Sequence, residues 1–233
     1  MNVRLNRQWL LALALPLVLT ACGDKEPEQR SAFIQFLQTR IIDKPGVHVP
    51  KPNADESKAF GPYTSDYSII TDFNSGMDES VKPLNGLLQK GAVRSLGDVV
   101  ARRDELQAAQ TGLNDMASQI KTKQAAADAA HAKLKQPDDL KAVYDKAYER
   151  TVSLPSNTFL EVLPQINGTL ASSLKVADYV NAHKAQIDVS GPAPKVQDPT
   201  VLKELNGLLQ DLATQAQGAQ QAQAKVQAVM LGR

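Results

Sequence analysis

Between Ser95 and Lys135 the chain has no proline, and apolar residues recur at every seventh position. The main row consists of Val99, Leu106, Leu113, Ile120, Ala127 and Leu134. A second row, three residues further on, consists of Ala109, Met116 and Ala130, with Lys123 interrupting it. At 1.5 Å per residue this heptad pattern covers about 50 Å, and it predicts one long helix with a packing seam along one side.

The segments before this helix also have helical spacing. Residues 28–42 place Phe33, Ile34, Leu37 and Ile41 on one helical face. That helix should end before the proline-containing stretch 43–53. Residues 54–91 predict two or three helical pieces, with a new helix opening at Gly61-Pro62 and weak points at residues 74–76 and at Pro83.

The segments after it show similar patterns. Pro137 should end the long helix and begin another, because Asp138 and Asp139 then lie near the positive end of the helix dipole. A further helix is expected over residues 156–187, bent near Pro164 and Gly168. Residues 188–200 predict a loop, and residues 201–230 a last helix. Its expected packing row is Leu202, Leu205, Leu209, Leu212, Ala216, Ala219, Val226 and Met230.

Almost no segment alternates apolar and polar residues as a half-buried strand does. The chain therefore predicts an all-α protein, an elongated bundle of about five or six helices forming a single domain over residues 31–233. Six aromatic residues lie between Phe33 and Phe73, and they should pack one end of the bundle.

The first residues have the composition of a secretory signal. Arg4 and Arg7 precede a short apolar run from Trp9 to Ala21, and a polar stretch follows. The run is shorter than the roughly 20 apolar residues of a membrane-spanning helix. Residues 1–21 are therefore expected to be a cleaved signal peptide, with residues 22–30 as a polar tether.

The sequence Leu19-Thr20-Ala21-Cys22 resembles the bacterial lipobox. This resemblance implies cleavage between Ala21 and Cys22 and acylation of Cys22, which would hold the protein at a membrane through its acyl chains. The alternative is an ordinary signal peptide with an incidental cysteine. By resemblance to the sorting rule of many Gram-negative bacteria, Gly23 in place of an aspartate favours the outer membrane, facing the periplasm, over the inner membrane.

Charge and motifs argue against several function classes. The 26 basic and 25 acidic residues leave a net charge of +1, which predicts no nucleic-acid partner. His48, His131 and His183 have no second ligand at a metal spacing, so no metal is expected. No nucleophile elbow, phosphate-binding glycine loop or metalloprotease motif is present, and we expect neither a cofactor nor an enzyme activity.

The weak candidates for a ligand site are Tyr63, Asp66 and Tyr67. An acidic residue between two phenols could line a cleft. The two tyrosines are also four residues apart, as on any helical face, so a purely structural role is the competing interpretation.

Three blocks of the sequence resemble the YiaF-like family of proteobacterial lipoproteins. They are "CGDKEPEQRSAFIQFLQ", "FGPYTSDYSII" and "AADAAHAKLKQPDDLKAVYDKAYE". The resemblance covers most of residues 22–185, and no matching block was found in Val189–Arg233. It implies an envelope lipoprotein and supplies no activity, substrate or catalytic residue.

Three hypotheses remain open. The first is a lipid-anchored, non-enzymatic bundle that binds or scaffolds another component of the cell envelope through a bundle face or its last helix. The second is a periplasmic carrier or sensor of a small molecule or lipid, with a pocket lined by the N-terminal aromatic residues. The third, an enzyme that uses Asp66, has the least support in the sequence.

Overall fold

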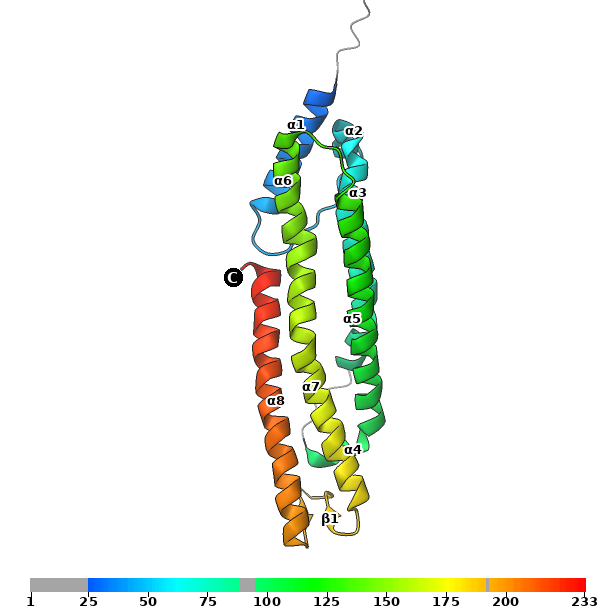
Figure 1. The fold of residues 1–233 in the computed structure, drawn as a ribbon, viewed down its shortest axis with the longest axis vertical. Coiled ribbons are helices and arrows are strands. Elements are labelled where there is room, and N and C mark those ends of the chain that lie inside the picture. The colour runs from blue at the N-terminus through cyan, green and yellow to red at the C-terminus, as the bar shows by residue number, and fades with distance from the viewer. Residues whose placement is uncertain (1–24, 89–94, 192) are drawn as a thin grey trace, which may run out of the picture.

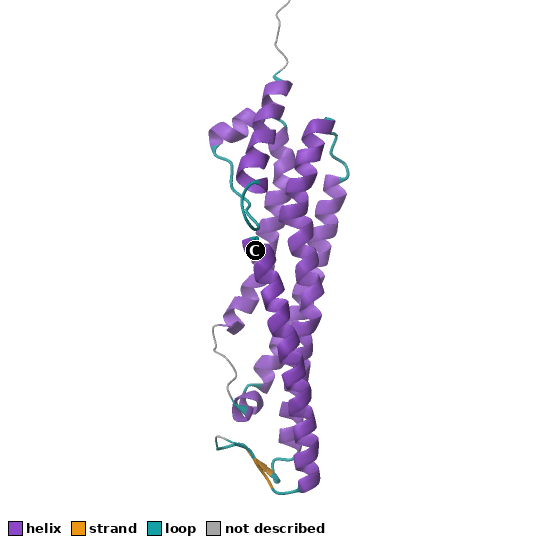
Figure 2. Cartoon of the chain, turned by 90° about the vertical axis from the view of Figure 1, so that its left-hand side faces the viewer, coloured by secondary structure: helices purple, strands orange, loops and turns teal. Residues whose placement is uncertain are grey.

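The computed structural model describes residues 25–88, 95–191 and 193–233, and most of them are helical. The elements are α1 (Glu26–Leu37), a π-helical turn η1 (Gln38–Ile42), α2 (Ala54–Phe60), α3 (Tyr63–Leu88), α4 (Leu96–Ala101), α5 (Arg103–His131), α6 (Asp138–Tyr148), a second π-helical turn η2 (Glu149–Ser153), α7 (Leu154–Ala182), β1 (Ile187–Asp188), β2 (Lys195–Val196) and α8 (Pro199–Leu231). They form an elongated rod, as Figures 1 and 2 show. The all-α prediction is confirmed.

The number of helices differs from the prediction. Counted as continuous rods, the described residues form seven helices instead of five or six. Two of the seven are the short helices α2 and α4: α2 ends just before Gly61-Pro62, where a new helix was expected to open, whereas the periodicity did not separate α4 from α5. Each begins with a capping box, in which Asn53 pairs with Glu56 and Ser95 with Asp98, so that backbone N–H groups at the helix start are satisfied.

The long heptad helix is interrupted at its start. The backbone at Arg102 leaves helical geometry (φ −102°, ψ 18°), which separates α4 from α5. Val99 therefore lies on α4, where it packs with Val176 and Ala177 of α7. Along α5 the predicted seam is confirmed by the buried residues Leu113, Met116, Ile120 and Ala127. The seam is thus built by one helix of 29 residues and a short helix that precedes it.

The helices α6 and α7, expected as separate elements, form one rod through η2 (Figure 1). Pro155, in the first turn of α7, has no N–H with which to bond the carbonyl four residues earlier, and its ring crowds that carbonyl. The wider π turn accommodates this. The Thr151 carbonyl receives the side-chain amide of Asn74 from α3 instead, at 3.2 Å.

Over residues 54–88 the chain forms two helical pieces, α2 and α3, as expected, and α3 runs without a break through the weak points at residues 74–76 and at Pro83. The Asn74 amide also donates to the Ile70 carbonyl at 2.8 Å, within the same helix. The Lys123 side chain of α5 lies against Gly76, since a Cβ at this position would be 2.9 Å from Lys123 Nζ. Pro164 lies inside α7 without ending it.

One end of the rod, which we call the head, is packed by aromatic residues as predicted. Phe33 is fully buried at its centre, with ring centroids 5.2 Å from Phe60, 5.9 Å from Tyr63 and 6.3 Å from Tyr144. The helix α1 begins at Glu26, inside the segment expected as tether, and has a proline in its first turn.

Below the head, α7 lies between α5 and α8, and α8 runs along one side of the rod (Figure 1). Ile187 pairs with Val196 in a two-residue antiparallel ladder at the far end, inside the region expected as a loop. The predicted packing row of α8 is wrong at both ends. Val201 is buried where Leu202 was expected, and Met230 is 40% exposed.

Candidate functional site

Tyr63 and Tyr67 lie in the aromatic core of the head, at 8% and 2% exposure. The Tyr67 hydroxyl donates to the Pro50 carbonyl at 2.6 Å, and the Tyr63 hydroxyl donates to Glu26. The Tyr63 ring stacks on Phe33 with an interplanar angle of 6°. Burial, and then the hydrogen bond to Glu26, raise the pKa of Tyr63 to about 12. Both phenols are therefore neutral and engaged in holding the head together.

Asp66 lies between them on α3 and is half-buried. Its carboxylate accepts a hydrogen bond from the side-chain amide of Gln136 at 2.6 Å. Its backbone carbonyl accepts one from the Tyr144 hydroxyl, also at 2.6 Å. The three candidate residues thus connect α3 to α1, to α6 with the residues just before it, and to the loop that contains Pro50. A ligand-binding role for them stays a prediction, and every contact described here is structural.

The expected lipidation and cleavage sites, Cys22 and Ala21, lie outside the described residues. Within the described part of the chain, no helix is long and apolar enough to cross a membrane. The same residues contain no group of three or more His, Cys, Asp or Glu side chains that could hold a metal ion.

A polar network joins the end of α5 to α6. His131 Nε2 lies 2.8 Å from Asp145 Oδ1, and Lys141 Nζ donates to Asp145 Oδ2 at 2.6 Å. The His131 ring stacks on Tyr148, whose hydroxyl donates to Asp128 at 2.8 Å. This is the arrangement of a structural histidine beside the α5 seam, and it closes the turn between two helices.

Asp145 should make the stability of the head sensitive to acid. Burial alone would raise its pKa, but the hydrogen bonds from Lys141 and His131 outweigh that effect and lower it below the usual 3.8. A lowered folded-state pKa contributes stability at higher pH, and the contribution is lost as the pH falls through that pKa. We expect Asp145→Asn to be less stable than the wild type at pH 6, with the difference shrinking below about pH 4.

Urea unfolding at a series of pH values would measure this difference. Asp115→Asn, at an exposed position on α5, is the matched control and should show no such pH-dependent gap. A gap for Asp145→Asn that stays constant from pH 6 to pH 3 would contradict the expectation.

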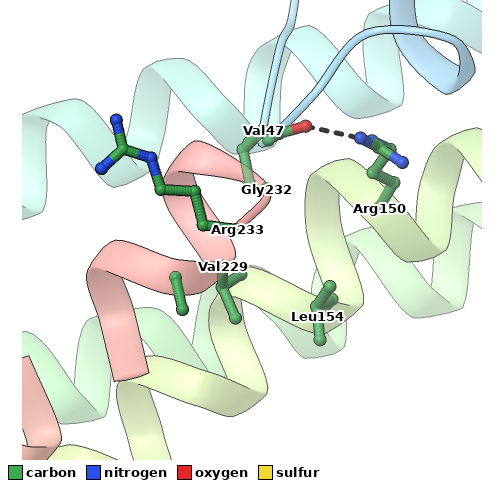
Figure 3. Close-up of a pocket in the computed structure, with 8 residues that line it drawn as sticks. Val47, Arg150, Leu154, Val229, Gly232 and Arg233 are labelled. Carbon is green, nitrogen blue, oxygen red and sulfur yellow. Dashed lines mark hydrogen bonds between the residues drawn. The ribbon is translucent and has the colours of Figure 1, made fainter. Parts of the chain in front are cut away.

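The pocket drawn in Figure 3 lies where three distant segments of the chain meet. They are the loop after η1, the turn η2 with the start of α7, and the end of α8. The pocket has a volume of about 270 Å³ and is lined by Gly46, Val47, Arg150, Leu154, Ala228, Val229, Gly232 and Arg233. We call it the junction pocket.

Arg150 holds the loop side of the junction pocket. Its Nε donates to the Gly46 carbonyl at 3.0 Å (Figure 3), and a second guanidinium nitrogen donates to the Lys44 carbonyl. The Val47 N–H donates to the Met230 carbonyl at 3.1 Å, which attaches the end of α8 to the same loop.

Two glycines allow the loop and the end of α8 to approach each other closely. Gly46 has φ +72° and Gly232 has φ +69°, a region that L side chains rarely adopt. A Cβ on Gly46 would lie 2.3 Å from the Met230 carbonyl oxygen, and one on Gly232 would lie 2.1 Å from the Gly46 nitrogen. The backbones of the loop and of α8 are therefore in direct contact.

Sequence reasoning missed the junction pocket entirely. Its residues are separated by up to 187 positions, between 46 and 233, and no motif marks them. The only local signals were Gly46 in a proline-containing loop and Gly232 directly after a helical row, which mark turns but not a contact between them.

Comparison with known proteins places the chain in a family. Residues 10–227 match the family described as "Protein of unknown function (DUF3053)". The chain belongs to the DUF3053 family. It is 35% identical over 219 residues to "Uncharacterized protein YiaF" of Escherichia coli strain K12 and to the protein of the same description from Shigella flexneri. Each alignment covers 91% of this chain and 91% of the relative.

This confirms the resemblance noted in the sequence and extends it over the last helix, since the DUF3053 match reaches residue 227. No solved structure matches the chain. The family carries no described activity, so the function of this DUF3053 protein has to be argued from its own residues.

Proposed function

We propose that this protein is a lipid-anchored, non-enzymatic binding or scaffold protein of the cell envelope, which contacts its partner through the outer face of α8. The observation that carries the proposal is the position of α8 along one side of the rod, with α7 on its inner side (Figure 1). Its buried residues are Val201, Leu205 and Ala222, and the opposite side of the helix is open to solvent.

The composition of that open side supports a binding role. Residues 212–224 contain no charged side chain, and glutamine and alanine make up most of them. Gln217, Gln220 and Ala224 lie on the outer face and are exposed. The cores of protein interfaces are depleted in charged residues, which agrees with an uncharged strip of this kind.

The proposed anchor is acylated Cys22, within the sequence that resembles the lipobox. Its distance from α1 limits how far the rod would lie from the membrane. Only four Cα-to-Cα steps separate Cys22 from Glu26, the first residue of α1, so acyl chains on Cys22 would lie within about 14 Å of the head. The continuous helix Asp138–Ala182 leads away from the head and is about 68 Å long at 1.5 Å per residue. We place the protein on the outer membrane, facing the periplasm, because Gly23 follows Cys22.

The test is site-specific photo-crosslinking of the full chain in its own envelope. A photoreactive residue at Gln217 or Gln220 should capture the same envelope protein, whereas one at Thr122, exposed on α5, should not. Cys22→Ser should release the protein from the membrane fraction and reduce the crosslink. Equal capture from Gln217 and Thr122 would contradict binding through α8, and unchanged fractionation of Cys22→Ser would contradict the anchor.

A further inference from the structure

We propose that the junction pocket binds an anionic amphiphile, meaning a single carboxylate or phosphate group on a short apolar chain. The inference goes beyond the scaffold function and does not depend on it, because the pocket is built entirely from described residues of the folded domain.

The first observation is an accumulation of exposed apolar side chains. Among the described residues four large apolar side chains are exposed, and only Leu202 lies elsewhere. Leu154 lines the pocket at 41% exposure, and Met230 and Leu231 belong to the turn of α8 that forms its wall. Exposed apolar residues are ordinary when scattered, but a group of them beside a pocket indicates a contact surface.

The second observation is the charge of the pocket. No acidic residue lines it, whereas Arg150 and Arg233 both do, on opposite sides of the Gly232 turn (Figure 3). Among the described residues, no Asp or Glu carboxylate lies within 4.0 Å of either guanidinium. Arg150 is half-buried, and its two hydrogen bonds go to neutral carbonyls, which leave its charge uncompensated.

The hydrogen bonds that hold the loop use only some of the N–H donors of Arg150. A guanidinium has five N–H donors, and two are used for the Gly46 and Lys44 carbonyls. The remaining donors are available for an anion, and the planar guanidinium suits carboxylate or phosphate geometry. Arg150 stays partly open to solvent, so an anion could reach the guanidinium and pair with the charge that the two carbonyls do not neutralise.

The volume of the pocket limits the size of the ligand. A volume of about 270 Å³ would hold about nine groups the size of a water molecule, each occupying about 30 Å³. That is enough for an anionic group and a short apolar chain, or for the first part of a longer chain that leaves through the open side. Binding pockets for small molecules combine such apolar walls with a few placed polar groups.

The experiment is photolabelling of the full-length protein, in nanodiscs of zwitterionic lipid, with an octanoic acid that carries a diazirine on its chain. We expect labelled peptides from the end of α8 and from the loop around Val47. Octanoate or octyl phosphate should compete with the label, and octanol should not. Stronger competition by octanoate would identify the source as a free fatty acid, and stronger competition by octyl phosphate a lipid headgroup.

Two variants test the pocket itself. Arg150→Gln removes the charge and should reduce labelling at least fivefold, whereas Arg103→Gln, an arginine bonded to Asp178 elsewhere, should leave it unchanged. Leu154→Glu places a negative charge at an exposed position of the wall, so it should reduce labelling without unfolding the protein. Competition by octanol equal to that by octanoate, labelling unchanged in both Arg150→Gln and Leu154→Glu, or no labelling of the pocket peptides would overturn the proposal.

Discussion

Phe33→Ala is expected to lower the free energy of unfolding by about 3–5 kcal/mol, the usual cost of removing a fully buried phenyl ring. The ring is surrounded by four other aromatic rings with centroids between 5.2 and 6.3 Å away. These rings come from α2, α3 and α6, so the side chain joins α1 to three other helices. Since rigid rings cannot collapse into the space it leaves, we expect a cost near the upper end of that range.

Urea unfolding monitored by circular dichroism at 222 nm would measure the loss. The matched control is Leu202→Ala, which truncates a large apolar side chain at 42% exposure and should change stability by no more than about 0.5 kcal/mol. A loss below about 1.5 kcal/mol for Phe33→Ala would mean that the head is not a tightly packed core.

Gly46→Ala is expected to detach the end of α8 from the head. The φ of +72° places an alanine in a region that costs about 1–2 kcal/mol for an L residue. The new Cβ would also lie 2.3 Å from the Met230 carbonyl oxygen, so the loop and α8 cannot keep their present separation. The hydrogen bond from Val47 to Met230 should be lost with them.

Hydrogen exchange would locate this effect. We expect faster exchange at Val47 and in the last turn of α8, with little change in the middle of α7. Gly207→Ala is the informative control, because a Cβ at Gly207 meets nothing within 4 Å and alanine favours a helix interior by up to about 1 kcal/mol. Gly207→Ala should therefore stabilise α8, whereas Gly46→Ala should release the end of α8 from the loop. Unchanged exchange in Gly46→Ala would show that the contact with the loop does not hold α8 in place.

The sequence alone was sufficient to predict the structural features that depend on the periodicity of apolar residues. The all-α class, the buried row Leu113, Ile120 and Ala127 on α5, and the aromatic head all followed from residue spacing. Spacing of this kind reflects which residues share a face of one helix, a property that 3.6 residues per turn dictates locally.

Helix boundaries and register needed the tertiary structure. Pro155 would be expected to end a helix, but the π turn and the amide of Asn74, 77 residues from the carbonyl it bonds, allow α6 and α7 to continue as one rod. On α8, Val201 and Leu202 are both apolar, and only the position of the neighbouring helix and hairpin decides which of them is buried.

The junction pocket shows most clearly what local sequence cannot contain. The sequence by itself determined that Gly46 lies in a proline-containing loop and that a helix begins after Pro137. The tertiary structure decided that this loop, the π turn and the end of α8 meet at one place. Such a contact depends on the lengths of α6, α7 and α8 and on how α8 folds back along α7, and these long-range constraints leave no pattern in the residues nearby.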